Sequence, residues 1–367
     1  MTPDAEPDDP SDDRSDAPAD DPTGDPTDDR RRPAGRVSVG LVLGAGGVAG
    51  AAFHAGALAA LAEATGWDPR TADLVVGTSA GASTAASLRS GLSAGDHLAR
   101  ATGRRLSAAG ADLVGDDDGP FSLDDVDAPP GNPWTAVTSR FVPAAPWLVG
   151  PALLRAGPTR WGVALAGLAP AGRRPTEPIG RRIRSGARGR WPDDPTWIVA
   201  YRTGDARRVV FGRDDVEVPD LATAVEASSA VPGRFQPVRL ESGRYLDGAV
   251  FSPTNADVVA PLGFDLVIVS APMSADPDLL ADGSELVNRP RAWFARLLGR
   301  EVAAIVDRGT EVLVVEPGRA ELLALRADLP DRELGPLVAD AAHESVLDQL
   351  ARPDRAGCLD LLARADR

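Results

Sequence analysis

Short β-branched runs alternate with longer stretches rich in alanine and leucine along most of this chain. Residues 37–43 form one such run, followed by a glycine-rich turn and an alanine-rich stretch over 50–64, which predicts strand, loop and helix. Residues 72–76 predict a second buried strand, and residues 80–89 a second helix. This alternation is typical of an α/β protein built on a parallel sheet.

The same pattern returns after residue 195. The expected elements are a two-stranded hairpin (196–201 with 208–211), two later strands (266–269 and 312–315) and three helices (221–227, 292–308 and 338–350). We therefore predict the α/β fold class, with a mostly parallel central sheet and helices on both faces.

Two segments depart from this pattern. Residues 1–36 contain almost no large apolar side chain, so we expect a disordered acidic tail before a catalytic domain over 37–367. Residues 105–195 are rich in Pro, Gly, Arg and Trp, and their apolar runs at 141–154 and 161–169 are interrupted. They predict an irregular insertion, which is a lid, a membrane-touching surface or ordinary helical packing.

The charged residues exclude several kinds of chemistry. All 39 basic residues are arginine, so a P-loop lysine, a pyridoxal Schiff base and a Ser-Lys dyad are excluded. The net charge is -15; the tail holds 12 acidic and 5 basic residues, which gives -7 there and leaves -8 for the rest. Nucleic-acid binding has little support from this balance, and the run 30–32 of three arginines is interpreted as solvated.

The remaining composition points to a reducing compartment. Cys358 is the single cysteine, and the N-terminus has no apolar region typical of a signal peptide, so we expect a cytoplasmic protein that can contact a membrane. No continuous apolar stretch is long enough to predict a transmembrane helix. Three scattered histidines and one cysteine offer no metal-ligand spacing, so we expect neither metal nor cofactor.

The sharpest local signal is a G-x-S-x-G motif formed by Gly77, Ser79 and Gly81. It lies between a predicted strand and a predicted helix, which is the context of a nucleophile elbow. The segment 91–95 also matches G-x-S-x-G, but it follows a helical stretch, so we interpret Ser93 as a helix cap.

A glycine-rich loop at 44–50 joins the first strand to the first helix. It satisfies the dinucleotide-binding pattern G-x-G-x-x-G/A, but Asp68, about 20 residues later, lies in a turn and not at a strand end. The alternative is an oxyanion hole built from the backbone amides of Gly46, Gly47 and Val48. The elbow downstream favours the oxyanion hole.

A third signal is Asp247, followed by Gly248 and Ala249, after an A-S-x-A-x-P segment at 227–232. An Asp-Gly pair by itself usually marks a turn. With the glycine loop and the elbow upstream, however, the order of motifs over most of residues 37–260 resembles that of the patatin-like phospholipases.

This resemblance implies a three-layer patatin-like fold and a serine acyl hydrolase acting on lipid esters, at a membrane surface in some settings. It implies that Ser79 is the nucleophile, Asp247 its base, and Gly46, Gly47 and Val48 the oxyanion donors. No histidine is required. Such an enzyme forms an acyl-enzyme on the serine, which water then hydrolyses.

The loop departs from the family's usual G-G-G-x-[KR]-G at two positions. Ala45 stands at the first of those glycines, and Ala49 stands where the basic residue is expected. Either an arginine from elsewhere in the chain replaces this cation, or the substrate is less anionic.

Two other functions stay open at this stage. A Ser-Asp-His triad would need His343, which is the only histidine after Asp247 but falls inside a predicted helix. A non-catalytic lipid- or nucleotide-binding module is the second alternative. His54 is interpreted as a packed or capping residue, and His97 receives no role.

Overall fold

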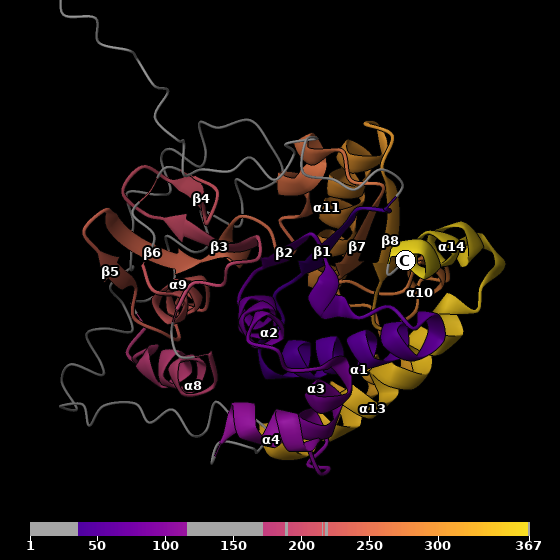
Figure 1. The fold of residues 1–367 in the computed structure, drawn as a ribbon, viewed down its shortest axis with the longest axis horizontal. Helices are drawn as coiled ribbons and strands as arrows, with labels where there is room; N and C mark the ends of the chain where they lie inside the picture. The colour runs from indigo at the N-terminus through magenta and orange to yellow at the C-terminus, as the bar shows by residue number, and fades with distance from the viewer. Residues whose placement is uncertain (1–35, 116–171, 188–189, 215, 217–218, 366–367) are drawn as a thin grey trace, which may run out of the picture.

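The protein is described here by a computed structural model, which places residues 36–115, 172–187, 190–214, 216 and 219–365. A single sheet of eight strands crosses the molecule in the order β5-β6-β3-β2-β1-β7-β8, with β4 pairing with β3 (Figure 1). The strands are β1 (Val39–Leu43), β2 (Leu74–Gly77), β3 (Thr196–Arg202), β4 (Arg207–Phe211), β5 (Val238–Leu240), β6 (Gly243–Asp247), β7 (Leu266–Ser270) and β8 (Glu311–Val315). The neighbours β3-β2-β1-β7-β8 run parallel, whereas β4, β5 and β6 pair antiparallel.

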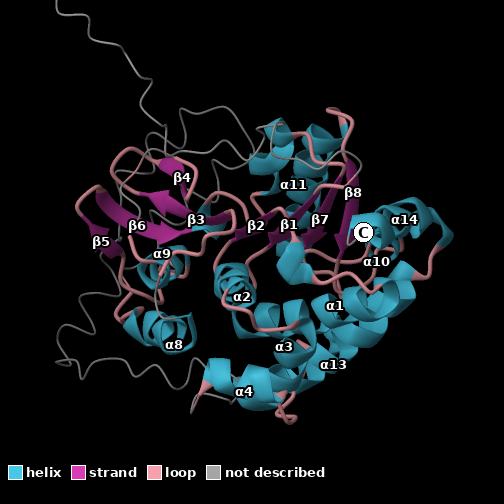
Figure 2. Cartoon of the chain, in the orientation of Figure 1, coloured by secondary structure: helices cyan, strands magenta, loops and turns pink. Residues whose placement is uncertain are grey.

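Helices cover both faces of the sheet (Figure 2). One face carries α1, α2, α9 and α13, and the other carries α11 and the 3-10 helix η6. The α-helices are α1 (Gly47–Thr65), α2 (Ala80–Arg89), α3 (Ala94–Ala101), α4 (Ala108–Val114), α8 (Glu177–Ala187), α9 (Leu221–Ser228), α10 (Pro277–Ala281), α11 (Arg289–Val306), α12 (Arg319–Ala324), α13 (Asp331–Leu350) and α14 (Ala356–Ala365), and η6 spans Ala256–Leu262. The structure is the predicted three-layer α/β fold.

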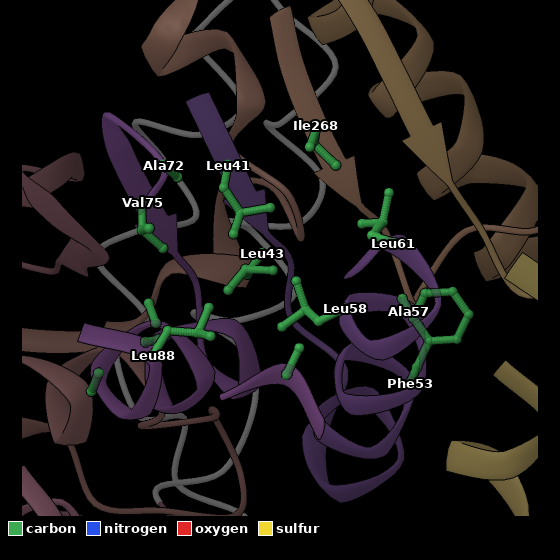
Figure 3. Close-up of a cluster of buried hydrophobic side chains, with 14 of the residues drawn as sticks. Leu41, Leu43, Phe53, Ala57, Leu58, Leu61, Ala72, Val75, Leu88 and Ile268 are labelled. Carbon is green, nitrogen blue, oxygen red and sulfur yellow. The ribbon is translucent and has the colours of Figure 1, made fainter. Parts of the chain in front are cut away.

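The alternation of side chains along the strands explains the two cores. In the central strand β1, Leu41 and Leu43 face α1 and α2, where they meet Leu58 and Leu88 (Figure 3). Val42 between them belongs to the core on the opposite face. All five residues of β1 are buried, as expected for a strand covered by helices on both sides.

Most expected elements are present with boundary shifts of a few residues. The helix predicted at 80–89 is α2, and the predicted hairpin is the antiparallel pair β3 and β4. Strands β5 and β6 were not predicted, because only the Asp-Gly turn was recognised there. The described parts of segment 105–195 include the helices α4 and α8, as expected if these parts serve ordinary helical packing.

Several segments that were interpreted from the sequence lie outside the described residues. These concern the acidic tail, of which only Arg36 is described, and the apolar runs at 141–154 and 161–169. Within the described ranges, α1 is the one helix long and apolar enough to cross a membrane, and most of it is buried inside the fold. Its length and hydropathy therefore suit a core helix.

Candidate active site

The sheet topology brings the three sequence motifs close together in space. The strands β1 and β2 are parallel neighbours with Leu43 opposite Gly77, so the glycine loop and the elbow leave the sheet side by side. Gly77 also lies opposite Ile198 of β3, and Asp247 of β6 lies opposite Ala200, two residues farther along β3. Asp247 is therefore level with the position two residues past Gly77, where Ser79 stands.

Ser79 occupies a sharp turn between β2 and α2. Its backbone has φ 55° and ψ -115°, and it is one of the few residues other than glycine with a positive φ in the described part of the chain. Although Ser79 is at the N-cap position, its side chain makes no capping hydrogen bond. This strained geometry leaves the hydroxyl available for chemistry.

The glycines of the motif make that turn sterically possible. A Cβ added to Gly81 would lie 1.9 Å from the carbonyl oxygen of Leu43, and one added to Gly77 would lie 2.5 Å from Cα of Ala82. The amide of Gly81 also donates to the Gly44 carbonyl at 3.2 Å. The elbow is thus packed directly against the glycine loop.

Asp247 is buried beside the Ser79 side chain, which acts on its carboxylate. One carboxylate oxygen, Oδ1, also accepts the Ala249 amide at 2.8 Å. Burial raises the pKa of Asp247 to about 7, although the hydrogen bond from the Ala249 amide and the interaction with the Ser79 side chain act in the opposite direction. A carboxylate with this pKa can accept a proton near neutral pH.

A buried serine from α9 fixes the nucleophile's backbone. The amide of Ser79 donates to Ser228 Oγ at 2.9 Å, and Ser228 Oγ donates to the Val199 carbonyl at 2.6 Å. Ser228 belongs to the A-S-x-A-x-P segment, so the motif contained the signal for it, but sequence analysis gave this residue no role.

Asn255 makes a second link between the elbow and the segment that follows Asp247. Its side-chain amide donates to Thr78 Oγ1 at 3.2 Å and to the Ser252 carbonyl at 2.6 Å. It has φ 52°, a conformation that asparagine tolerates better than most residues. No sequence signal pointed to Asn255.

The glycine loop presents amides toward the same place. The amides of Gly44 and Ala45 are occupied by the carbonyls of Ser270 and Pro253. The first helical hydrogen bond of α1 runs from Gly50 to Gly46, so the amides of residues 47–49 have no partner within the helix. Within the described ranges the Gly46 amide also has no backbone acceptor.

The three residues predicted as oxyanion donors lie at the surface of the cavities that contain Ser79. Gly46 and Val48 are partly exposed, and Gly47 is exposed with φ 61°, a conformation that favours glycine. Backbone amides at a helix N-terminus are suited to stabilising a developing negative charge.

His54 of α1 holds this loop from beneath. A carbonyl oxygen can only accept, so His54 Nε2 donates to the Gly44 carbonyl at 2.7 Å, and Nδ1 accepts from Ser270 Oγ at 2.8 Å. Burial lowers the pKa of His54 to about 4, despite the Gly44 hydrogen bond, so the ring is neutral at physiological pH. The packed residue expected from sequence therefore supports the glycine loop.

Two cavities share Gly47, Ser79 and Val231 in their walls. The first, of about 260 Å³, follows α2 and is bounded mainly by small or apolar residues of α1 to α4 and α8. The second, of about 400 Å³, includes Asp247 and lies toward α11 and α12. Ser79 is thus placed in the wall that the two cavities share.

Of the other histidine, serine and aspartate candidates from the sequence, only His97 reaches the cavities at this site. His343 Nε2 lies 2.9 Å from Glu63, at the far end of α1 and about 24 Å along the helix from Gly47. Ser93 caps α3, accepting from the Asp96 amide and donating to its carboxylate at 2.7 Å. His97 lines the first cavity and Asp68 caps a short 3-10 helix, away from any strand end.

The family model described as "Patatin-like phospholipase" matches residues 41–151 and 168–260, which is more than half of the chain. Among solved structures, the chain is similar to VipD from Legionella pneumophila, with 15% sequence identity, a TM-score of 0.38, and coverage of 86% of this chain and 67% of that one.

Proposed function

Because the chain belongs to the patatin-like phospholipase family, we propose that it hydrolyses carboxylic esters of lipids with a Ser79–Asp247 dyad. The observation that carries this proposal is the buried Asp247 carboxylate beside the Ser79 side chain, with both residues in the wall of the same cavity. A buried carboxylate with its pKa raised to about 7 is a stronger base than an exposed aspartate.

The proposed reaction has two stages. Asp247 accepts the Ser79 proton as Oγ attacks the ester carbon, and the carbonyl oxygen becomes negative against the amides of Gly46, Gly47 and Val48. The tetrahedral intermediate then expels the alcohol, which receives that proton from Asp247. Water, deprotonated by Asp247, then attacks the acyl-Ser79 ester. The second tetrahedral intermediate releases the fatty acid as Asp247 returns this proton to Ser79 Oγ.

The first cavity supports an acyl chain as the bound group. Its wall includes Ser79, Ser83, Ser87 and Ser90, which recur on one face of α2. These positions extend over about 16 Å of helix. An extended hydrocarbon advances about 1.2 Å per bond, by analogy with an extended backbone, so a chain of about 12 carbons fits this length.

We further propose that the enzyme works on lipid at a membrane surface in the cytoplasm. A cavity bounded mainly by small and apolar residues favours substrates that bring a long acyl chain, and such lipids are aggregated in water. Hydrolysis should therefore accelerate above the critical micelle concentration of the substrate. Equal rates below and above that concentration would contradict surface action.

Hydrolysis of 4-nitrophenyl laurate by purified variants tests the dyad. We expect Ser79→Ala and Asp247→Asn to lose turnover by about a thousandfold or more, while Ser93→Ala and His343→Ala keep wild-type rates. Loss of turnover in folded His343→Ala would support the Ser-Asp-His triad instead. A wild type without esterase activity would favour a lipid- or nucleotide-binding module.

A further inference from the structure

The second cavity contains an arginine that sequence analysis did not single out. Arg291, from the first turn of α11, lines it together with Ser79, Asp247 and Ala49. Ala49 is the loop position where a basic residue was expected. A cation from a distant part of the chain therefore faces the same space as that position.

Part of the Arg291 guanidinium is hydrogen-bonded to backbone carbonyls of the protein itself. Its Nη1 donates to the carbonyls of Pro272 at 2.9 Å and Ser274 at 2.6 Å. The remaining N–H groups, on Nε and Nη2, have no acceptor among the described residues. Arg291 also forms no ion pair within 4.0 Å with a carboxylate in those ranges.

Partial burial makes the positive charge of Arg291 energetically unfavourable. The residue is partly buried, and burial lowers the pKa of Arg291, while the nearby Glu321 acts in the opposite direction. Glu321 is itself buried, which raises its pKa and favours its neutral form, and it already accepts from Ser345 and the Gly318 amide. A partly desolvated guanidinium with three unused donors is suited to an anionic ligand.

We propose that Arg291 binds the phosphate of a phospholipid head group while the ester is hydrolysed at Ser79. This inference rests on the proposed function and assigns the second cavity to the head-group side of the substrate. Guanidinium binds phosphate oxygens with two N–H groups in parallel, and the donors on Nε and Nη2 provide such a pair. Arg291 then replaces the cation that Ala49 lacks.

A purely structural role for Arg291 makes a different prediction. The Pro272–Ser274 segment that it holds packs on the glycine loop, since a Cβ added to Gly46 would lie 3.1 Å from the Pro272 Cβ. If Arg291 only supported this segment, its loss would misplace the oxyanion donors for every ester. A phosphate-binding role affects only substrates that carry phosphate.

The test compares two substrates with the same acyl chains, dilauroylphosphatidylglycerol and dilaurin, in mixed micelles of one non-ionic detergent. We expect Arg291→Met to lower kcat/KM for the phospholipid by about tenfold or more and for dilaurin by less than about threefold. Arg291→Lys, which keeps the charge but not the planar fork, should fall between wild type and Arg291→Met on the phospholipid. Arg296→Met, an exposed change on the same helix, should match wild type on both.

Equal losses on both substrates, or no loss on either, would overturn the proposal. Hydrolysis of dilaurin but not of the phospholipid by wild type would overturn it as well, while leaving the ester hydrolase function intact. If the wild type hydrolyses neither substrate, or folded Ser79→Ala retains turnover, the proposed function itself fails.

Discussion

His54 Nε2 donates a 2.7 Å hydrogen bond to the carbonyl oxygen of Gly44, which also accepts the amide of Gly81. One carbonyl thereby joins the first core helix, the glycine loop and the nucleophile elbow. The adjoining amide, that of Ala45, is held by the Pro253 carbonyl, so this peptide unit is fixed at both ends. The loop geometry thus depends on a histidine that takes no part in proton transfer.

Replacing His54 should therefore reduce kcat more than it affects KM. We expect His54→Leu to lower kcat by about 10-fold to 100-fold, because misplaced amides stabilise the oxyanion less well, with KM within about threefold. His54→Gln, which keeps a donor, should retain more activity. Steady-state kinetics on a neutral ester measure this, with His343→Ala, a change in α13 beside Glu63, as the control.

The same variants distinguish a supporting histidine from a basic one. The pKa of His54 is about 4, so its titration lies below the working range. The pH midpoint of kcat/KM should stay unchanged in His54→Gln. A midpoint that disappears in this variant would mean that His54 is the base.

The pH profile of the wild type should report Asp247. Its pKa is raised to about 7 by burial, and the ionised form is the one that accepts the serine proton. Activity should therefore rise about tenfold per pH unit below pH 7 and level off above it. A profile of kcat/KM on a neutral ester from pH 5 to 9 measures this. Flat activity down to pH 5 would show that a group of lower pKa serves as the base.

Adding one methyl group to the elbow should destabilise the whole domain. Gly81→Ala would place Cβ 1.9 Å from the Leu43 carbonyl oxygen of the central strand, so β1 and α2 would have to move apart. We expect the free energy of unfolding to fall by about 2 kcal/mol or more. Denaturant titration of the purified variant gives this value.

Gly299→Ala is the matched control for that substitution. Gly299 lies in α11, and an added Cβ would meet no atom within 4 Å. The change should stabilise the protein by about 0.5 to 1 kcal/mol, since alanine is the better helix former. Equal effects of the two substitutions would contradict the close packing of the elbow on β1.

Blocking the first cavity should change the preferred chain length. Ser87 lies on the cavity face of α2, about 12 Å along the helix from Ser79. Ser87→Phe should reduce kcat/KM for a laurate ester by about tenfold and leave a butyrate ester within about twofold. Parallel losses on both esters would show that the acyl chain does not follow α2.

The fold could be predicted from the sequence wherever buried strands and helices differ in their residue pattern. The apolar run of β1 and the alanine-rich α1 have such patterns. The short strands β5 and β6 do not, because β5 is only partly buried and β6 joins the sheet by pairing with β3, which lies far earlier in the sequence.

The candidate site was predictable only where the backbone demands particular residues. The elbow requires glycine on both sides of Ser79, and this leaves a readable motif. Arg291 reaches the cavity from α11, and no local pattern marks such a long-range approach. His54 was visible in the sequence, but its role depends on a carbonyl ten residues earlier and on Ser270 from β7.

The most direct test of the central claim is the identity of the residue that an alkyl fluorophosphonate modifies in the full-length protein. Intact-mass and peptide mass spectrometry should find one adduct, on Ser79, in wild type, Ser93→Ala and His343→Ala. Labelling should be absent in Ser79→Ala and strongly slowed in Asp247→Asn. An adduct on another serine, or undiminished labelling of Ser79→Ala, would contradict the account.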